Sequence, residues 1–85
     1  MNITLLYFAA LRERLGIERE SVQLPDEVQT AAQLRAWLAG RGGVWSEALA
    51  SGRALRMAVN RKLADPGTPL VEGAEVAVFP PVTGG

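Results

Sequence analysis

The feature that most constrains the fold is a pair of short apolar runs near the two ends of the chain. Residues 2–8 read NITLLYF and residues 75–79 read EVAVF, and both runs are rich in residues that favour strands. The chain between them is long enough to include a helix, so the two strands can lie side by side in parallel. The sequence therefore predicts that the two terminal strands are neighbours in one sheet.

The alternation of side chains along these runs assigns them to faces. Successive residues of a strand point to opposite faces of the sheet. One face is expected to carry Ile3, Leu5, Tyr7, Val76 and Val78, and the other Thr4, Leu6, Phe8, Glu75, Ala77 and Phe79. Because both faces of the first strand carry large apolar groups, we expect a central strand that is covered in part on both sides.

The middle of the chain predicts one main helix. Thr30 and Gln33 match a capping box at a helix start, and the glycines that follow residue 39 end the helix. An apolar stripe at helical spacing consists of Ala31, Leu34, Trp37 and Leu38. We expect Trp37 to be a core anchor of this helix.

Shorter elements complete the pattern. Residues 9–15 favour a short helix or turn, 17–24 a second strand, 44–50 a second short helix and 54–60 a third strand. Val44 and Trp45 are expected to pack the short helix onto the sheet edge. This order predicts an α+β roll, a mixed sheet over one main helix, with a domain at 1–79 and an extended tail at 80–85.

Composition excludes several kinds of chemistry. The 85 residues fit one domain, and the nine basic and nine acidic residues cancel, so nothing favours nucleic acid or an anionic membrane as a partner. Without Cys and His, the thiolate nucleophile, the imidazole base and the usual zinc ligands are missing, and we expect no metal site. The opening apolar run is too short to span a membrane and resembles no signal peptide. We therefore expect a cytoplasmic protein.

The remaining polar residues are interpreted as surface and turn residues. The closest acidic pairs, Glu18/Glu20, Asp26/Glu27 and Glu72/Glu75, are expected to be solvated. The run Gly40–Gly43 follows a helix rather than a strand and lacks the Lys-Ser/Thr of a phosphate loop. Asn60 is expected to be a turn residue that hydrogen-bonds its own backbone.

The tail is the most conspicuous candidate site. Pro80 and Pro81 favour extended geometry, so the last six residues form a stiff arm that reaches at most about 20 Å. The glycines at its tip have no Cβ, so a partner's narrow channel can close around Gly84 and Gly85. ATP could convert the terminal carboxylate to an acyl-adenylate, and a sulfur donor could then displace AMP to leave a thiocarboxylate.

The sequence resembles a known family in this region. Residues 70–85, LVEGAEVAVFPPVTGG, closely resemble the end of the molybdopterin synthase small subunit (molybdopterin-converting factor subunit 1), a ubiquitin-like sulfur carrier. The segment from Phe8 to Gly16 is similar to that family's first strand and helix, and Ala58–Asn60 to its central strand. Gly-Gly alone would be shared with ubiquitin and other sulfur carriers, so the longer run is the specific part.

The resemblance implies a fold, a reaction and partners. It implies a β-grasp fold in which Gly85 is adenylated by an enzyme of the ubiquitin-activating type, with ATP, and then thiocarboxylated; the carrier binds no cofactor of its own. The tail, Pro80, Pro81, Val82, Thr83 and Gly84 included, would enter the large subunit's active site and give sulfur to cyclic pyranopterin monophosphate, forming molybdopterin. Two copies of each subunit form a heterotetramer in this family. The resemblance also implies an apolar patch against the large subunit made of Phe8, Leu63 and Phe79.

Three other functions fit parts of the same sequence. A carrier for thiamine-thiazole synthesis would keep the chemistry, although such carriers are shorter and lack the Phe-Pro-Pro run. A ubiquitin-like protein modifier would join the same Gly-Gly to lysines of other proteins. An adaptor domain with an idle tail would lose nothing when the two glycines are removed.

Overall fold

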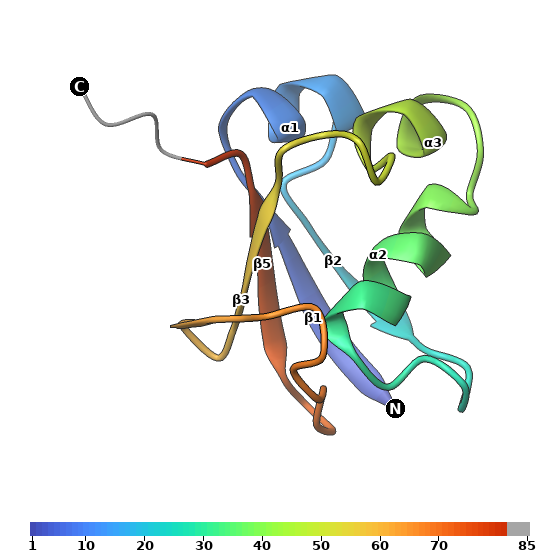
Figure 1. Cartoon of the computed structure of the whole chain (residues 1–85), viewed down its shortest axis with the longest axis vertical. Coiled ribbons are helices and arrows are strands. Elements are labelled where there is room, and N and C mark those ends of the chain that lie inside the picture. Colours follow the sequence, from blue (N-terminus) through green and yellow to red (C-terminus); the bar gives the residue numbers. More distant parts are fainter. Residues whose placement is uncertain (82–85) are drawn as a thin grey trace.

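A five-stranded mixed sheet forms the frame of the protein. The computed structural model describes residues 1–81 (Figure 1). The strands lie in the order β2-β1-β5-β3-β4. Their bounds are β1 Asn2–Tyr7, β2 Arg19–Gln23, β3 Arg56–Val59, β4 Lys62–Leu63 and β5 Glu75–Phe79. The two terminal strands pair in parallel, with Leu5 opposite Val76, and this confirms the prediction that they are neighbours. All other pairs are antiparallel.

Three helices connect the strands. They are α1 Ala9–Leu15, α2 Ala31–Ala39 and α3 Val44–Ala48. The helix α2 crosses one side of the sheet, and α1 and α3 lie together at the end of the sheet where β1 and β5 terminate (Figure 1). The predicted α+β roll with one main helix is confirmed.

The predicted capping box starts α2. The Thr30 hydroxyl accepts a hydrogen bond from the Gln33 amide at 3.3 Å, and the Gln33 side-chain oxygen accepts one from the Thr30 amide at 3.1 Å. Both amides belong to the helix start, where no earlier carbonyl is available to them. The capping box fixes the residue at which α2 begins, and the apolar stripe of the helix packs against the sheet.

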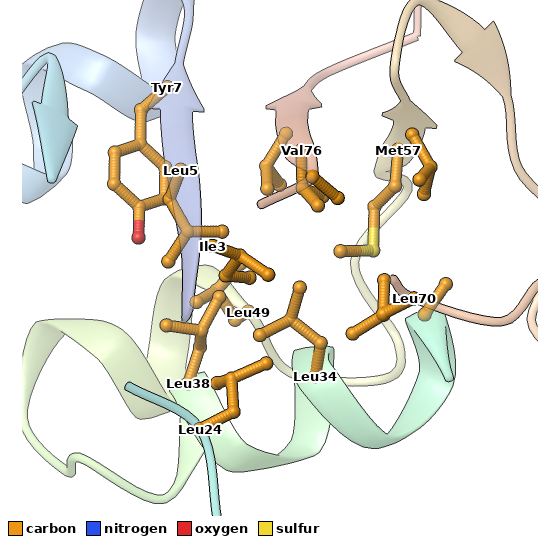
Figure 2. Packing of buried hydrophobic residues seen from close by; sticks show 14 of the residues in the cluster. Ile3, Leu5, Tyr7, Leu24, Leu34, Leu38, Leu49, Met57, Leu70 and Val76 are labelled. Atoms are coloured by element: carbon orange, nitrogen blue, oxygen red, sulfur yellow. The ribbon is translucent and has the colours of Figure 1, made fainter. Parts of the chain in front are cut away.

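The core lies between the sheet and α2. The inward side chains of β1 and β5 and the stripe of α2 are almost inaccessible to solvent, and Figure 2 shows several of them packed together. They include Ile3, Leu5, Tyr7, Val76, Val78, Leu34 and Leu38. The expectation for Trp37 needs correction, because its ring is only partly buried and packs against the edge of this cluster. The positions at the centre of the stripe are Leu34 and Leu38.

The hairpin between β3 and β4 departs from the expected turn. Asn60 and Arg61 both have positive φ values, 49° and 71°, the pattern of a two-residue hairpin loop. The Asn60 side-chain oxygen accepts a hydrogen bond from the Glu75 amide at 2.9 Å, so Asn60 caps the start of β5 rather than its own backbone. The expected strand at 54–60 is accordingly limited to Arg56–Val59, and β4 is a two-residue strand.

Candidate functional site

The open face of the sheet, the face opposite α2, holds the candidate docking residues. Residues directly paired in neighbouring strands share a face, and the register aligns Leu6 with Ala77, Ala77 with Ala58, and Ala58 with Leu63. This gives an apolar row across four strands. We use the name open face for Leu6, Phe8, Ala58, Leu63, Ala77 and Phe79 together.

Two of these side chains are among the large apolar groups most exposed to solvent. Phe8 is 42% exposed and Leu63 is 65% exposed, whereas Phe79 is partly buried. Phe8 immediately follows β1, serves as the N-cap residue of α1 and has extended backbone geometry, so its ring continues the outward alternation of the strand. The structure thus brings the three residues named for the apolar patch to one face, with Leu63 three strands away from β1.

The tail begins at the end of the sheet beside Phe8. The Phe8 amide donates a hydrogen bond to the Val78 carbonyl at 3.3 Å, and Phe79 pairs with Arg56. Pro80 and Pro81 follow and are partly buried. The expectations for Val82, Thr83, Gly84 and Gly85 fall on positions outside the described residues. The chain therefore leaves the sheet next to the open face (Figure 1).

Charged residues lie at the border of the open face. Arg19 pairs with Leu6 on the β2 side, Arg56 pairs with Phe79, and Glu75 pairs with Thr4 at the other end of the sheet. An apolar centre with a charged border is the arrangement of a protein-binding surface. What these described residues offer is an apolar contact surface beside Phe79, the residue after which Pro80 begins the tail.

A partly buried polar cluster lies on the other side of the sheet, where the sequence predicted only solvated charges. Glu20 accepts hydrogen bonds from the Tyr7 hydroxyl at 2.8 Å and from both terminal nitrogens of Arg41, at 2.8 and 3.0 Å. Glu20 is therefore only partly solvated, with 21% of its side chain exposed, and not fully solvated as expected. The only signal in the sequence was its alternation with Val22, which places Glu20 on the inward face of β2.

The cluster shifts the protonation equilibria of its members. Burial raises the pKa of the Tyr7 hydroxyl, and the hydrogen bond to Glu20 adds to that effect. Burial alone would raise the pKa of Glu20, but hydrogen bonds from Arg41 and Tyr7 outweigh it and lower the pKa below its ordinary value. The hydrogen bond to Glu20 raises the pKa of Arg41. These groups lie on the inward face of the sheet, opposite the open face, so the cluster belongs to the scaffold rather than to the candidate site.

The strand order and the helix packed across one face define the class of this protein, a ubiquitin-like β-grasp domain. Solved structures support it: SAMP1 from Haloferax volcanii is 26% identical, with a TM-score of 0.75 and full coverage of both chains. A protein–protein complex of subunits 1 and 2 of molybdopterin-converting factor from Helicobacter pylori contains a chain that is 27% identical, with a TM-score of 0.67 and full coverage of both chains.

Sequence comparison places the chain more narrowly. Residues 5–85 match the ThiS family. Two relatives, from Haemophilus influenzae and Escherichia coli, are each 40% identical over 98% of this chain and 99% of their own length, and both are named molybdopterin synthase sulfur carrier subunit. The chain therefore belongs to the ThiS family and, within it, to the molybdopterin synthase sulfur carrier subunits.

Among the described residues, no helix is both long and apolar enough to cross a membrane.

Proposed function

We propose that this protein carries sulfur on its C-terminal glycine for the synthesis of molybdopterin. The observation that carries the proposal is the 40% identity, over nearly the whole chain, to two proteins named molybdopterin synthase sulfur carrier subunit. The sequence after β5 supports it, because two prolines favour an extended exit from the sheet and two glycines without Cβ end the sequence, and because Phe8 and Leu63 expose large apolar groups on the open face.

The proposed chemistry takes place on Gly85. An adenylyltransferase of the ubiquitin-activating type joins the Gly85 carboxylate to AMP from ATP and releases pyrophosphate. A sulfur donor then displaces AMP, which leaves a thiocarboxylate whose soft sulfur is a better nucleophile than the carboxylate oxygen. The carrier needs no bound cofactor of its own in this scheme. Gly84 has no Cβ, so the reactive end can pass through a narrow channel.

The proposed acceptor site belongs to a large subunit. The Helicobacter pylori relative of known structure is in a complex of subunits 1 and 2, which supports a partner of this kind. We place the large subunit against the open face, with Phe8, Leu63 and Phe79 as contacts, and with Pro80 and Pro81 leading Val82 and Thr83 into its active site. There the thiocarboxylate gives its sulfur to cyclic pyranopterin monophosphate. Two carriers and two large subunits form the proposed heterotetramer, which we assign to the cytoplasm.

The test is reconstitution with a shortened and a lengthened tail. The intact chain, a chain without Gly85 and a chain with one added glycine are each combined with the large subunit, the activating enzyme, ATP and a sulfide donor. We expect molybdopterin from the intact chain only, because the reactive atom is displaced in the other two. Circular dichroism serves as the control that all three are folded. Undiminished product from either altered tail would overturn the proposal.

A second candidate function is protein modification. The observation that favours it is the similarity to SAMP1, since proteins of that name include small archaeal modifier protein 1. The same activated Gly85 would then form an isopeptide bond with lysine side chains of other proteins. Conjugates of higher mass in cells, lost when Gly85 is deleted, would favour this function over sulfur transfer.

A further inference from the structure

Two arginines flank the apolar rows of the open face at the end of the sheet where Pro80 follows β5 (Figure 1). Arg19 of β2 is paired with Leu6, and Arg56 of β3 is paired with Phe79, so both arginines lie on the same face as these apolar residues. Both arginines are exposed. A partner that covers Leu6 and Phe79 therefore also reaches the two guanidinium groups.

Neither arginine forms an ion pair within residues 1–81. The ion pairs found there join α1 to α3 and Arg41 to Glu20, away from the open face. A guanidinium group that a partner covers without supplying an acceptor loses its hydration and keeps unsatisfied donors, which is strongly unfavourable. The open face is therefore suited to a partner that supplies carboxylates beside Arg19 and Arg56.

The distance between the two arginines indicates how many anionic groups they can bind. From β2 to β3 there are three steps in the strand order, or about 14 Å at the usual spacing of neighbouring strands. Arg56 also precedes Ala58, which lies in the row of Arg19, by two residues, and this adds a shift of about 7 Å along the strands. To hold one small anion together, both side chains would have to lie flat across the apolar rows and cover them. The positions thus favour two separate anionic groups, one on each side of the apolar contact.

The charges of the open face differ between its two ends. The far end has one outward acidic residue, Glu75, and one basic residue of the hairpin loop, Arg61, which offset each other. The end beside Pro80 has Arg19 and Arg56, while alternation places the preceding acidic residue, Glu18, on the other side of the sheet. The charged residues of α1 and α3, two basic and two acidic, cancel. An excess of positive charge therefore lies where the tail begins.

We propose that the large subunit carries two acidic residues that pair with Arg19 and Arg56 on either side of the apolar contact. This inference rests on the function proposed above, which makes the large subunit the partner of the open face, and it adds the charge of the partner's docking surface. The two pairs orient the complex. After a half-turn on the face, the acidic residues would lose both arginines and meet Glu75 instead.

The same charges act before the two proteins touch. Attraction between opposite charges raises the rate at which proteins associate in the correct orientation. The chain has nine basic and nine acidic residues, so this attraction comes from the arrangement of its charges and not from its net charge. Because water can reach both arginines at the border of the face, their effect should be larger on association than on dissociation.

The test measures the association rate of the full chain with the large subunit by stopped flow at several salt concentrations. Arg19→Gln and Arg56→Gln should each slow association about threefold at low salt, and the double variant about tenfold. The rate of the intact chain should fall as the salt rises toward about 0.5 M, and the rate of the double variant should depend less on salt. The double variant Arg19→Lys, Arg56→Lys should keep most of the rate, because steering depends on charge.

Lys62→Gln is the control for a change of net charge. Lys62 is also an exposed basic residue of the sheet, but it pairs with Val59, a residue of the buried inward face. Its replacement removes the same charge and should change the association rate by less than about 1.5-fold. Urea unfolding should show equal midpoints for all variants, because all three replaced side chains are exposed.

The outcomes separate this inference from the proposed function. If the glutamine double variant associates as fast as the intact chain, or if the rate of the intact chain rises with salt, the inference is overturned and the proposed function stands. An equal loss of rate from Lys62→Gln would also overturn it, since net charge alone would then explain the effect. Absence of any complex between the intact chain and the large subunit would overturn the proposed partner and this inference with it.

Discussion

Arg41 shows how single residues hold the scaffold together. Its guanidinium carbon lies 4.4 Å from the ring centre of Trp45 and 5.1 Å from that of Trp37, while its nitrogens bind Glu20. One side chain therefore joins the end of α2 to β2 and to α3. The Trp45 ring in turn packs edge-on against Tyr7, with 5.5 Å between the ring centres. The Arg41 guanidinium is therefore held both by cation–π contacts with the two tryptophans and by charge-assisted hydrogen bonds to Glu20.

The Glu20 carboxylate should make stability depend on pH. Its pKa is lower in the folded protein than its ordinary value of 4.5, so the unfolded chain binds more protons. The stabilisation is therefore present above that value and is lost as the pH falls through the folded pKa. We expect Glu20→Gln to lower the free energy of unfolding by about 1–2 kcal/mol at neutral pH. The difference from the unchanged protein should shrink as the pH falls toward about 3.

Urea unfolding at several pH values measures this difference. Glu47→Gln is the matched control, because Glu47 also pairs with an arginine, Arg14, at 3.0 Å but on an exposed surface. Glu47→Gln should lower the free energy of unfolding by less than about 0.5 kcal/mol. Equal costs for the two substitutions at neutral pH, or a Glu20→Gln difference that does not change with pH, would contradict the role given to the cluster.

At the scale of the elements, the β3–β4 hairpin contains avoidable strain. Arg61 has a φ of 71°, and a positive φ is costly for a residue with a Cβ. Arg61→Gly should therefore raise the free energy of unfolding by about 0.5 kcal/mol, after allowance for the greater freedom of glycine in the unfolded chain. Lys62→Gly, one residue later in β4 and without a positive φ, should lower it. A loss of stability from Arg61→Gly in denaturant unfolding would show that its side chain stabilises the loop.

The elements were largely predictable because local signals agree with the fold. The capping box of Thr30 and the alternation in 2–8 and 75–79 each depend on only a few neighbouring residues. The structure contains both the capped helix and the two strands that they predict. The roles of Asn60 and Glu20 were not predictable, because their hydrogen-bond partners, Glu75 and Tyr7, are 15 and 13 residues away in the sequence. A contact between distant residues leaves no periodic pattern for a sequence to show.

For the candidate site, alternation in the sequence predicted the face on which Phe8 and Phe79 lie but not the position of Leu63. Alternation alone put Phe8 and Phe79 opposite the core, and the structure agrees. The position of Leu63 on that face depends on its pairing with Ala58 across the hairpin, which no short-range pattern indicated.

At the scale of the whole molecule, the open face should determine affinity for the large subunit. Phe8→Ser and Leu63→Ser remove exposed apolar groups, so each should leave stability within about 0.5 kcal/mol. Each should weaken the complex by at least about tenfold, because central apolar contacts dominate protein interfaces. Val71→Ser is the matched control, since Val71 is 52% exposed and lies outside the open face. Titration calorimetry measures the affinities, and equal affinity for all three variants would remove the open face from the proposed interface.

The central claim is that Gly85 carries sulfur, and intact mass spectrometry after co-expression with the activating enzyme tests it most directly. Exchange of one carboxylate oxygen for sulfur adds about 16 Da to the chain. We predict this increase in the intact chain, with the added mass on the C-terminal peptide, and no increase in a chain that lacks Gly85. An unchanged mass in the presence of an active activating enzyme and a sulfur donor would contradict the account.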